Sequence, residues 1–549
     1  LYGLGSAYGL GYIPGSWMES IQVSKGIASV RNGYEAITGQ INVEYKKPPG
    51  GEKAFFNLYG NSSGKAEGNF NGAVKIGENL STSLLAHGEL DRMIDDHNGD
   101  GFRDEPNVKQ YHLFNRWEYM TDRVHIRAGA KYLTEERIAG QVNYSPDSDN
   151  GSYGILINTD RAEAFTKTGY IFPADRSMSL GWINSFTWHR QDATYGLRAY
   201  SGNQRSYYSN LLYQWKPALD EHTFDAGLSY KYDDYEENLD GTDMLRTEKV
   251  PGMLFQYSYL DTTLITVVAG IRADFHNLYG TFITPRFHLR YEPIDRFIIR
   301  ATAGKGYRST NVLAESQFLL ASSRTVEIAP DLGHEEAVNA GINLTKYLTA
   351  GGRELRLSAD YYYTGFIRQI ITDLDADINR VLFYNLDGRS YSNIIQFEAQ
   401  WEPVSRLDIL LAMRFNDVKT TTAGELREKA LTSRYKGLFT ASYLSYLRKW
   451  QYDLSFQLNG PGRVPSTLSN PLEHQRPESF GAYPMINFQV QRKFKSWEIY
   501  AGAENLTNYK QENPVISADN PFSNHFDAGL VWGPVMGRMI YGGIRITIN

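Results

Sequence analysis

The feature that most constrains this chain is an alternation of apolar and polar residues with a period of two. In RVHIRAGAKY (residues 123–132), apolar residues fill the even positions, while Arg, His and Lys stand at odd ones. ELRLSADYYY (354–363) and GNFNGAVKI (68–76) repeat the pattern. A period of two with one apolar face predicts β-strands that have one wet face. A soluble β-sandwich or propeller would show the same alternation.

Ten short polar connections separate the alternating runs, and two strands with one longer loop lie between successive connections. They are IGEN (76–79), MTDR (120–123), FPADR (172–176), KPALDE (216–221), LDT (260–262), EPIDR (292–296), LTAGGR (348–353), EPVSR (402–406), LRK (447–449) and KFKS (493–496). Short turns at one end and long loops at the other are typical of outer-membrane barrels. Ten turns with both sheet ends on the turn side imply eleven hairpins, and therefore 22 antiparallel strands.

Aromatic residues gather beside these turns, as in the belt at the interface of a membrane barrel. They are Trp117, Tyr119, Tyr170, Phe172, Tyr213, Trp215, Tyr257, Tyr259, Tyr291, Phe297, Tyr347, Trp401, Tyr446, Trp450, Phe494 and Trp497. One of the longest apolar runs, LITVVAGI (264–271), is too short for a membrane-spanning helix. A propeller would repeat a blade of about 40–50 residues, and the sequence shows no such repeat. We therefore predict an all-β, 22-stranded transmembrane barrel.

The end of the chain agrees with this prediction. In IYGGIRITIN (540–549), four Ile residues share one face, opposite Tyr541, Arg545 and Thr547. The run is similar to the terminal strand by which outer-membrane barrels are recognised for insertion, although Asn549 stands where the last aromatic residue is usual.

A barrel of this size encloses a lumen too wide for side chains to fill, and the first 50 residues suggest what fills it. The run SIQVSKGIASVRNGYEAITGQINVEYKKP (20–48) resembles the end of the plug domain of TonB-dependent outer-membrane receptors. The matching residues are Val23, Lys25, Gly26, Ala28, Ser29, Val30, Gly33, Gly39, Ile41, Asn42, Lys46, Lys47 and Pro48. Its alternating runs can form a small sheet inside the lumen. We expect residues 1–50 to be the C-terminal part of a plug and 51–549 to be the barrel, with the TonB box upstream of this sequence.

Three further stretches are similar to elements of this family. GKGYRSTNVLAE (304–315) and APDLGHEEAVNAGINL (329–344) resemble a paired signature beyond the middle of the barrel, and ENLTNY (504–509) resembles an Asn-Leu element near the C-terminus. The resemblance implies a receptor in the bacterial outer membrane whose plug is pulled by TonB, powered by the inner-membrane proton gradient. The implied partners are TonB, outer-membrane lipid, a small chelate or vitamin and, as a candidate, a surface lipoprotein.

The expected cargo is compact, because carbohydrate receptors of this family are usually much longer. A ferric siderophore or another metal chelate is favoured, and a cobalamin receptor or a passive porin are the alternatives. The Tyr-rich stretch SGNQRSYYSN (201–210), interpreted as a loop, could stack on such a cargo or pack within the protein. Heme is not expected, because no His lies between Arg308 and Pro330; His334 is interpreted as an exposed loop residue.

Other functional classes find little support. The chain has no Cys and a formal net charge of −6, which excludes disulfides and gives no electrostatic basis for binding nucleic acid. No H-E-x-x-H, G-x-S-x-G or P-loop motif is present, so we do not expect an enzyme. Luminal charges such as Arg127, Lys131, Arg356 and Asp360 are interpreted as a wetted inner wall that faces the plug.

One loop has the spacing of a calcium site. In DDHNGDGFRDEPN (95–107), oxygen ligands could come from Asp96, Asn98, Asp100, the carbonyl of Phe102 and Asp104. These are positions 1, 3, 5, 7 and 9 of a calcium loop, with Gly at position 6. The loop lies between predicted strands, which excludes a helix–loop–helix sensor. Asn at position 12 predicts weak affinity, with Kd roughly 10⁻⁴–10⁻³ M. The alternative is a turn cluster that binds no ion.

Overall fold

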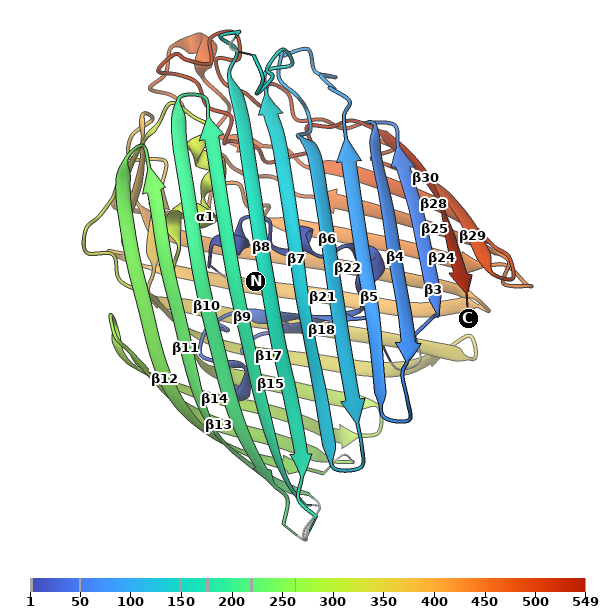
Figure 1. Cartoon of the computed structure of the whole chain (residues 1–549). Helices are drawn as coiled ribbons and strands as arrows, with labels where there is room; N and C mark the ends of the chain where they lie inside the picture. The colour runs from blue at the N-terminus through green and yellow to red at the C-terminus, as the bar shows by residue number, and fades with distance from the viewer. Residues whose placement is uncertain are drawn as a thin grey trace.

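The computed structural model describes residues 3–48, 51–148, 150–173, 177–217, 221–261 and 263–548. Nearly all of the described strand residues belong to one closed antiparallel barrel (Figure 1). The barrel strands are β3 (Ala54–Asn61), β4 (Lys65–Lys75), β5 (Leu80–Asp91), β6 (Asn107–Met120), β7 (Val124–Gly140), β8 (Gly154–Ile171), β9 (Met178–Tyr195), β10 (Arg198–Trp215), β11 (His222–Leu239), β12 (Thr242–Leu260), β13 (Ile265–His276), β14 (Gly280–Ile294), β15 (Phe297–Arg308), β17 (Glu335–Ala350), β18 (Arg353–Arg368), β21 (Ser390–Val404), β22 (Leu407–Thr422), β24 (Tyr435–Leu444), β25 (Trp450–Asn459), β28 (Tyr483–Lys493), β29 (Trp497–Glu504) and β30 (Met539–Ile548).

This set confirms the predicted 22 strands. A short additional strand, β23 (Glu425–Glu428), pairs only with the outer end of β22, and β24 takes its place along the rest of β22. The wall closes where β30 pairs with β3, from Ala54 opposite Ile548 to Asn61 opposite Tyr541. Closure leaves no open sheet edge, which a bilayer would penalise.

All ten predicted turns connect the expected strand pairs, from β4–β5 to β28–β29, and they lie at one end of the barrel (Figure 1). Parts of the turns that begin at Phe172, Lys216 and Leu260 lie outside the described residues. The long loops lie at the opposite end. Within the described ranges, no helix is long and apolar enough to cross a membrane.

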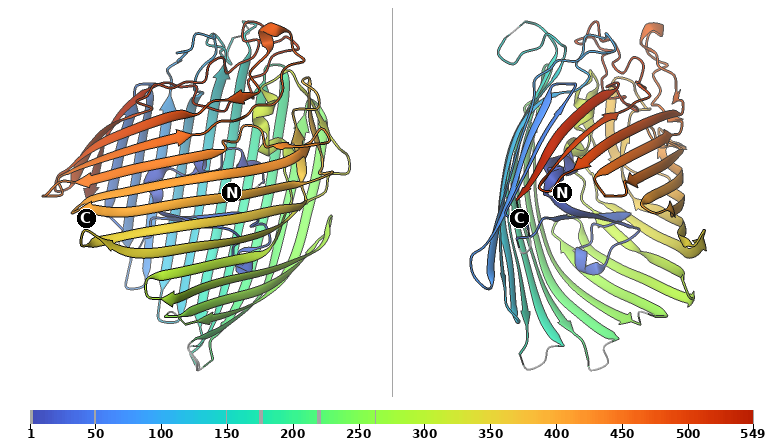
Figure 2. Two further views of the ribbon diagram at one scale, coloured as in Figure 1. Left: turned by 180° about the vertical axis from the view of Figure 1, so that it is seen from behind. Right: turned by 90° about the vertical axis from the view of Figure 1, so that its right-hand side faces the viewer.

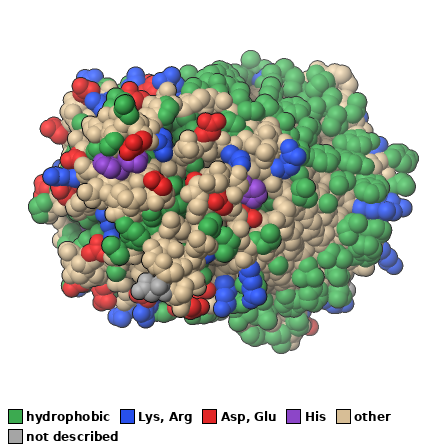
Figure 3. Space-filling view, turned by 90° about the horizontal axis from the view of Figure 1, so that it is seen from above, with side chains coloured by type: hydrophobic (Ala, Val, Ile, Leu, Met, Phe, Trp, Pro, Cys, Tyr) green, Lys and Arg blue, Asp and Glu red, His purple; other side chains and the backbone are tan. Residues whose placement is uncertain are grey.

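The barrel wall is apolar outside and polar inside. On β11, Leu228 is 62% exposed on the outer face, whereas Asp233, Asp225 and Lys231 are buried on the luminal face. Seen from the loop end, hydrophobic side chains gather along the rim and charges over the loops (Figure 3). This arrangement is the reverse of that in a soluble protein, and it suits a barrel in lipid, where the outer apolar side chains contact acyl chains instead of water.

The N-terminal residues 3–48 lie inside the barrel (Figures 1 and 2). They contain short 3₁₀ turns and a two-stranded antiparallel sheet of β1 (Met18–Lys25) and β2 (Gly39–Tyr45), which confirms the predicted small sheet. We call residues 3–48 the luminal segment.

The long loops build a roof over the loop end of the lumen. It contains the helical turn α1 (Val312–Glu315), a three-stranded sheet of β16 (Thr325–Ile328), β20 (Arg380–Asn385) and β19 (Ile370–Asp373), and the short pair β26 (Gly462–Arg463) and β27 (Ser479–Phe480). Its apolar core joins Leu319, Val381, Phe383, Phe480 and Leu530. Because these residues come from four loops, the roof is one packed unit.

Candidate functional site

A cavity of about 640 Å³ lies between the luminal segment and the roof. Its floor includes Glu35, Ile37, Thr38 and Gly39 of the luminal segment, and its walls come from α1, β19 and the loop ends of β21 and β22. Two parts of the chain form this cavity: the luminal segment supplies the floor, and the barrel strands and loops supply the walls. We call it the hydroxyl-walled cavity.

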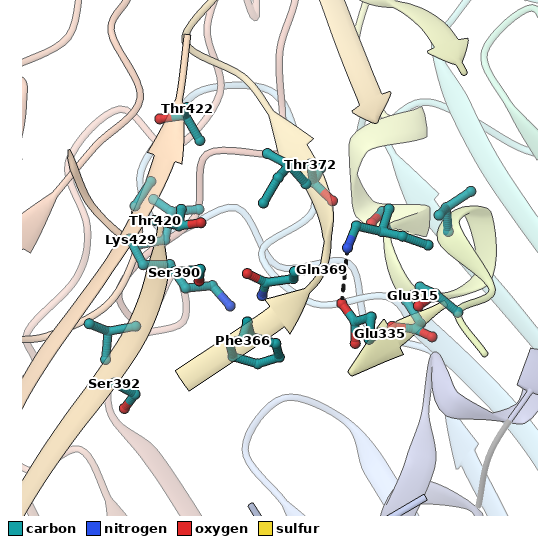
Figure 4. A pocket seen from close by; sticks show the side chains of 18 of the residues that line it. Glu315, Glu335, Phe366, Gln369, Thr372, Ser390, Ser392, Thr420, Thr422 and Lys429 are labelled. Carbon is teal, nitrogen blue, oxygen red and sulfur yellow. Dashed lines mark hydrogen bonds between the residues drawn. The ribbon is translucent and has the colours of Figure 1, made fainter. Parts of the chain in front are cut away.

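The name comes from the side chains of Ser390 and Ser392 on β21 and of Thr420 and Thr422 on β22 (Figure 4). Ser390 pairs directly with Thr420 in the sheet. Since alternate residues of a strand share one face, residues two apart on neighbouring strands point into the same space. Gln369 and Thr372 add an amide and a further hydroxyl from the other side, beside the ring of Phe366 (Figure 4).

Arg308 links the two mid-barrel motifs of the sequence at the edge of this cavity. Its guanidinium forms ion pairs with Glu335, 2.8 Å away, and with Glu315, 2.9 Å away. Arg308 also stands opposite Glu335 in the pairing of β15 with β17. Burial raises the pKa of Glu315, and the charge of Arg308 opposes that rise only in part. The paired signature therefore has a structural meaning: it holds α1 against the barrel wall.

A second ion pair closes the other side of the cavity. The Arg463 guanidinium binds both carboxylate oxygens of Asp375, at 2.7 and 2.8 Å. Burial acts to raise the pKa of Asp375, but the hydrogen bonds and charge of Arg463 hold it below its usual value. Bidentate pairs of this kind are strong and directional, so this contact fixes β26 to the loop after β19.

A neighbouring cavity of about 790 Å³ shares Thr310, Val312 and Ile370 with the first. Its charged lining is balanced between Glu237, Asp240, Arg198 and Arg246. The Arg246 guanidinium donates to the Thr310 carbonyl at 2.8 Å and pairs with Glu248 at 3.1 Å. The two cavities thus adjoin beneath the roof.

The luminal segment is bound to the wall mainly through its backbone carbonyls. Arg286 on β14 donates to the carbonyls of Ala28 and Ser29, both at 3.0 Å, and to those of Tyr34 and Ala36, at 3.1 and 3.4 Å. No other luminal side chain among the described residues forms as many hydrogen bonds to the segment. Arg286 therefore acts as its central fastening.

The luminal charges singled out in the sequence divide into two groups. The Lys131 Nζ donates to the Tyr12 carbonyl at 2.7 Å, and Asp360 pairs with Lys25 at 2.8 Å. Arg127 and Arg356 instead pair with Glu118 and Glu398 on adjacent strands. The prediction that these charges face the plug-like segment is therefore correct for Lys131 and Asp360. Arg127 and Arg356 instead form ion pairs within the wall.

The predicted calcium loop has a well-defined backbone. The carboxylate of Asp96 accepts the amides of Gly99 at 2.7 Å, Asp100 at 3.2 Å and Gly101 at 3.0 Å. The carboxylate of Asp104 contacts the His97 ring at 3.0 Å, and its second oxygen is buried without a hydrogen-bond partner. Asn98 donates to Asp100 at 2.9 Å. In the described ranges, no three His, Cys, Asp or Glu side chains are arranged to hold a metal ion, so calcium binding stays a prediction.

Phe102 connects this loop to the last loop of the barrel. Its ring stacks on Phe526, with centroids 5.8 Å apart, and both pack with Tyr153. Its carbonyl stays a predicted calcium ligand, and the structure adds a packing role for its side chain. Lys510 from the last loop also donates to the His97 carbonyl at 2.8 Å.

Two interpretations of the sequence are wrong. His334 is only 5% exposed and packs against Tyr279, Phe282 and Tyr307, so it is not an exposed loop residue. The stretch 201–210 is part of β10 and not a loop. Strands β8 to β12 have 18 or 19 residues, more than the roughly 9–11 that span a bilayer. Polar residues near the loop end therefore still belong to strands.

The hydroxyl wall is not evident from the sequence alone. Ser390 with Ser392 and Thr420 with Thr422 follow a spacing of two near the loop ends of paired strands. That spacing marks one luminal face, but only the fold shows that a cavity lies in front of it.

Comparison with known proteins agrees with this architecture. The family described as "TonB dependent receptor-like, beta-barrel" matches residues 88–506. A search of the curated proteins found no match. The siderophore receptor PirA from Acinetobacter baumannii has a similar solved structure, with 13% identity, a TM-score of 0.76, and coverage of 98% of this chain and 86% of that chain.

Two structures from Pseudomonas aeruginosa are also similar. PirA has 12% identity, a TM-score of 0.69 and coverage of 96% and 86%. A mutant of the ferric enterobactin receptor PfeA, in complex with enterobactin, has 13% identity, a TM-score of 0.76 and coverage of 98% and 87%. At such identity these likenesses show the fold alone, whereas the family match covers most of the chain. This chain belongs to the TonB-dependent receptors, a family of transport proteins of the bacterial outer membrane.

Proposed function

We propose that this protein takes up a ferric siderophore or another compact metal chelate across the outer membrane. The supporting observation is the hydroxyl-walled cavity, which is enclosed between the luminal segment and the roof and measures about 640 Å³. That volume falls within the roughly 300–1,000 Å³ of small-molecule sites, so it suits a compact cargo and not a long glycan. The siderophore receptors among its structural neighbours support the same class of cargo.

The luminal segment is proposed to be the C-terminal part of a plug. Cargo binds beneath the roof, and TonB then pulls on the plug to open a passage through the lumen. The segment contributes Glu35, Ile37, Thr38 and Gly39 to the cavity floor, so its movement would alter the binding site directly. A passive porin needs no segment that is fastened across its lumen by Arg286.

The experiment is uptake of radiolabelled ferric chelates by cells that express the full receptor gene. We expect uptake that stops when TonB is deleted or when the proton gradient is collapsed. Uptake that continues unchanged under both conditions would contradict energised transport and favour a porin. Faster uptake of cobalamin than of every iron chelate would replace the proposed cargo with the vitamin.

We also propose that calcium orders the loop of residues 95–107 as a structural ion. The buried, unpartnered oxygen of Asp104 supports this proposal. The contacts of Phe102 and Lys510 with the last loop offer a route by which an ordered loop would shape the mouth of the receptor.

A further inference from the structure

The charges that line the hydroxyl-walled cavity are nearly all neutralised by one another. Its acidic residues are Glu35, Glu315, Glu335 and Asp375, and its basic residues are Arg308, Lys429 and Arg463. Four acids against three bases leave one excess negative charge. Arg308 is held by two Glu residues, Arg463 is held by Asp375, and Glu35 is held by Lys231 at 2.6 Å.

Lys429 is the exception among the basic side chains of this cavity. No carboxylate of the described residues lies within ion-pair distance of its Nζ. Lys429 directly follows β23, its side chain is exposed, and it lies beside Thr420 (Figure 4). A single exposed ammonium cannot neutralise a multiply charged ligand. Any further cation would have to leave its carboxylate partner, which would strand that carboxylate without a counter-charge in a partly buried site.

The cavity is rich in neutral hydrogen-bonding groups instead. Ser390, Ser392, Thr420 and Thr422 provide hydroxyls, and Gln369 provides an amide (Figure 4). Hydroxyls both donate and accept, so they suit a ligand whose surface carries uncharged carbonyl and amide groups. They provide little compensation for the lost hydration of a strong anion.

Resting on the proposed function, we propose that the cargo is an uncharged ferric chelate of the tris-hydroxamate class and not an anionic tris-catecholate. Three singly ionised hydroxamates neutralise Fe³⁺, whereas three doubly ionised catecholates leave the complex triply negative. The carboxylates Glu315 and Glu335 select against the anionic class, both by repulsion and by occupying Arg308.

The test measures equilibrium binding to the purified receptor by quenching of its Trp fluorescence. The probes are ferrichrome, an uncharged tris-hydroxamate, and ferric enterobactin, a tris-catecholate. We expect ferrichrome to bind at least about tenfold more tightly, with an affinity that salt barely changes. Replacing hydroxyls in Ser390→Ala/Thr420→Ala should weaken ferrichrome binding about tenfold, as expected for the loss of about two hydrogen bonds.

Glu315→Gln/Glu335→Gln tests the selection itself. Freeing Arg308 should strengthen ferric enterobactin binding about tenfold or more and change ferrichrome binding less than about threefold. Glu327→Gln is the matched control, because Glu327 pairs with Arg380 in the same roof but does not line the cavity. Heat-modified mobility on gels confirms that each variant has a folded barrel.

The outcomes separate this inference from the function on which it rests. If the unmodified receptor prefers ferric enterobactin and Lys429→Met abolishes that preference, the charge-class inference is wrong, while siderophore uptake stands. If the Glu variant gains no affinity for ferric enterobactin, charge is not the basis of selection and the inference fails. If a folded receptor binds neither chelate, the proposed siderophore function fails as well.

Discussion

Arg286 illustrates how single luminal side chains hold the segment inside the barrel. Its two terminal nitrogens reach four carbonyls that span residues 28–36. Only the planar fork of arginine can serve so many acceptors from one position, because a lysine ammonium is a compact point charge with three donors. The contact uses backbone carbonyls and so depends little on the side chains of the segment.

We predict that Arg286→Ala loosens the luminal segment without opening the barrel wall. Hydrogen bonds from a charged donor contribute about 1.5–3 kcal/mol each, and losing several should raise hydrogen exchange around residues 26–38 by at least about tenfold. Arg286→Lys should recover only part of the protection. Arg127→Ala is the control, because Arg127 pairs with Glu118 on the wall. Equal exchange in Arg286→Ala and the unmodified protein would show that the fastening lies elsewhere.

The loop of residues 95–107 gives a prediction that depends on pH. Burial, followed by the negative charges of Asp96 and Asp104, raises the pKa of Asp100 above 3.8. Because the pKa of Asp100 is higher in the folded state, its protonated form stabilises the folded loop. This contribution is complete below the pKa of the unfolded state and is lost as the pH rises through the pKa of the folded state. At neutral pH the loop therefore carries electrostatic strain that a divalent cation would relieve.

We expect millimolar calcium to protect this loop from proteolysis at about pH 7 and to protect it less as the pH falls, because burial raises the pKa of Asp100 and protons then compete with the cation. EDTA should remove the protection. Asp96→Ala/Asp100→Ala should lose it, whereas Asp147→Ala, an exposed acid in the next loop, should retain it. Calcium that protects all of these proteins equally, or none, would leave the loop as a turn cluster without an ion.

At the scale of elements, the roof is a small folded unit set on a membrane barrel. Its core residues Leu319, Val381, Phe383 and Phe480 are nearly inaccessible to solvent, and they come from loops far apart in the chain. The barrel strands below it are joined by continuous backbone ladders. The roof should therefore unfold locally before the barrel does.

We predict that Phe383→Ala destabilises the roof by about 3–5 kcal/mol, the usual cost of deleting a buried aromatic side chain. Hydrogen exchange should rise in β16, β19 and β20, while the thermal unfolding of the barrel changes little. Phe397→Ala is the control, because Phe397 is 52% exposed on the barrel wall. Barrel and roof that lose stability together in Phe383→Ala would show that they fold as one cooperative unit.

At the scale of the whole molecule, the luminal segment and the roof divide the interior into layers. The outer wall is apolar, the inner wall is polar, the segment crosses the lumen, and the two adjoining cavities lie between segment and roof. Since the segment forms the floor of the hydroxyl-walled cavity, a force on it acts directly on the site. In the proposed mechanism, cargo binding and opening of the lumen would therefore involve neighbouring residues of one short stretch of chain.

Much of this molecule follows from local sequence. A period of two specifies a strand and assigns each residue to one face, so the ten turns, the 22 strands and the luminal position of Lys131 or Asp360 can be predicted from neighbouring residues alone. The sheet of β1 and β2 follows for the same reason. The extension of β10 beyond the bilayer cannot be predicted in this way, because a strand can show the same alternation of apolar and polar residues in water and in lipid.

Only the tertiary structure decided which luminal groups meet. Arg308 and Glu335 are 27 residues apart, and Asp375 and Arg463 are 88 residues apart, yet these pairs determine the charge of the cavity. His334 became buried because aromatic residues of β14 and β15 surround it. The period of two indicates which face of the sheet a side chain occupies. Its partner across the lumen depends on strand register and loop packing, which are set by contacts between distant parts of the chain.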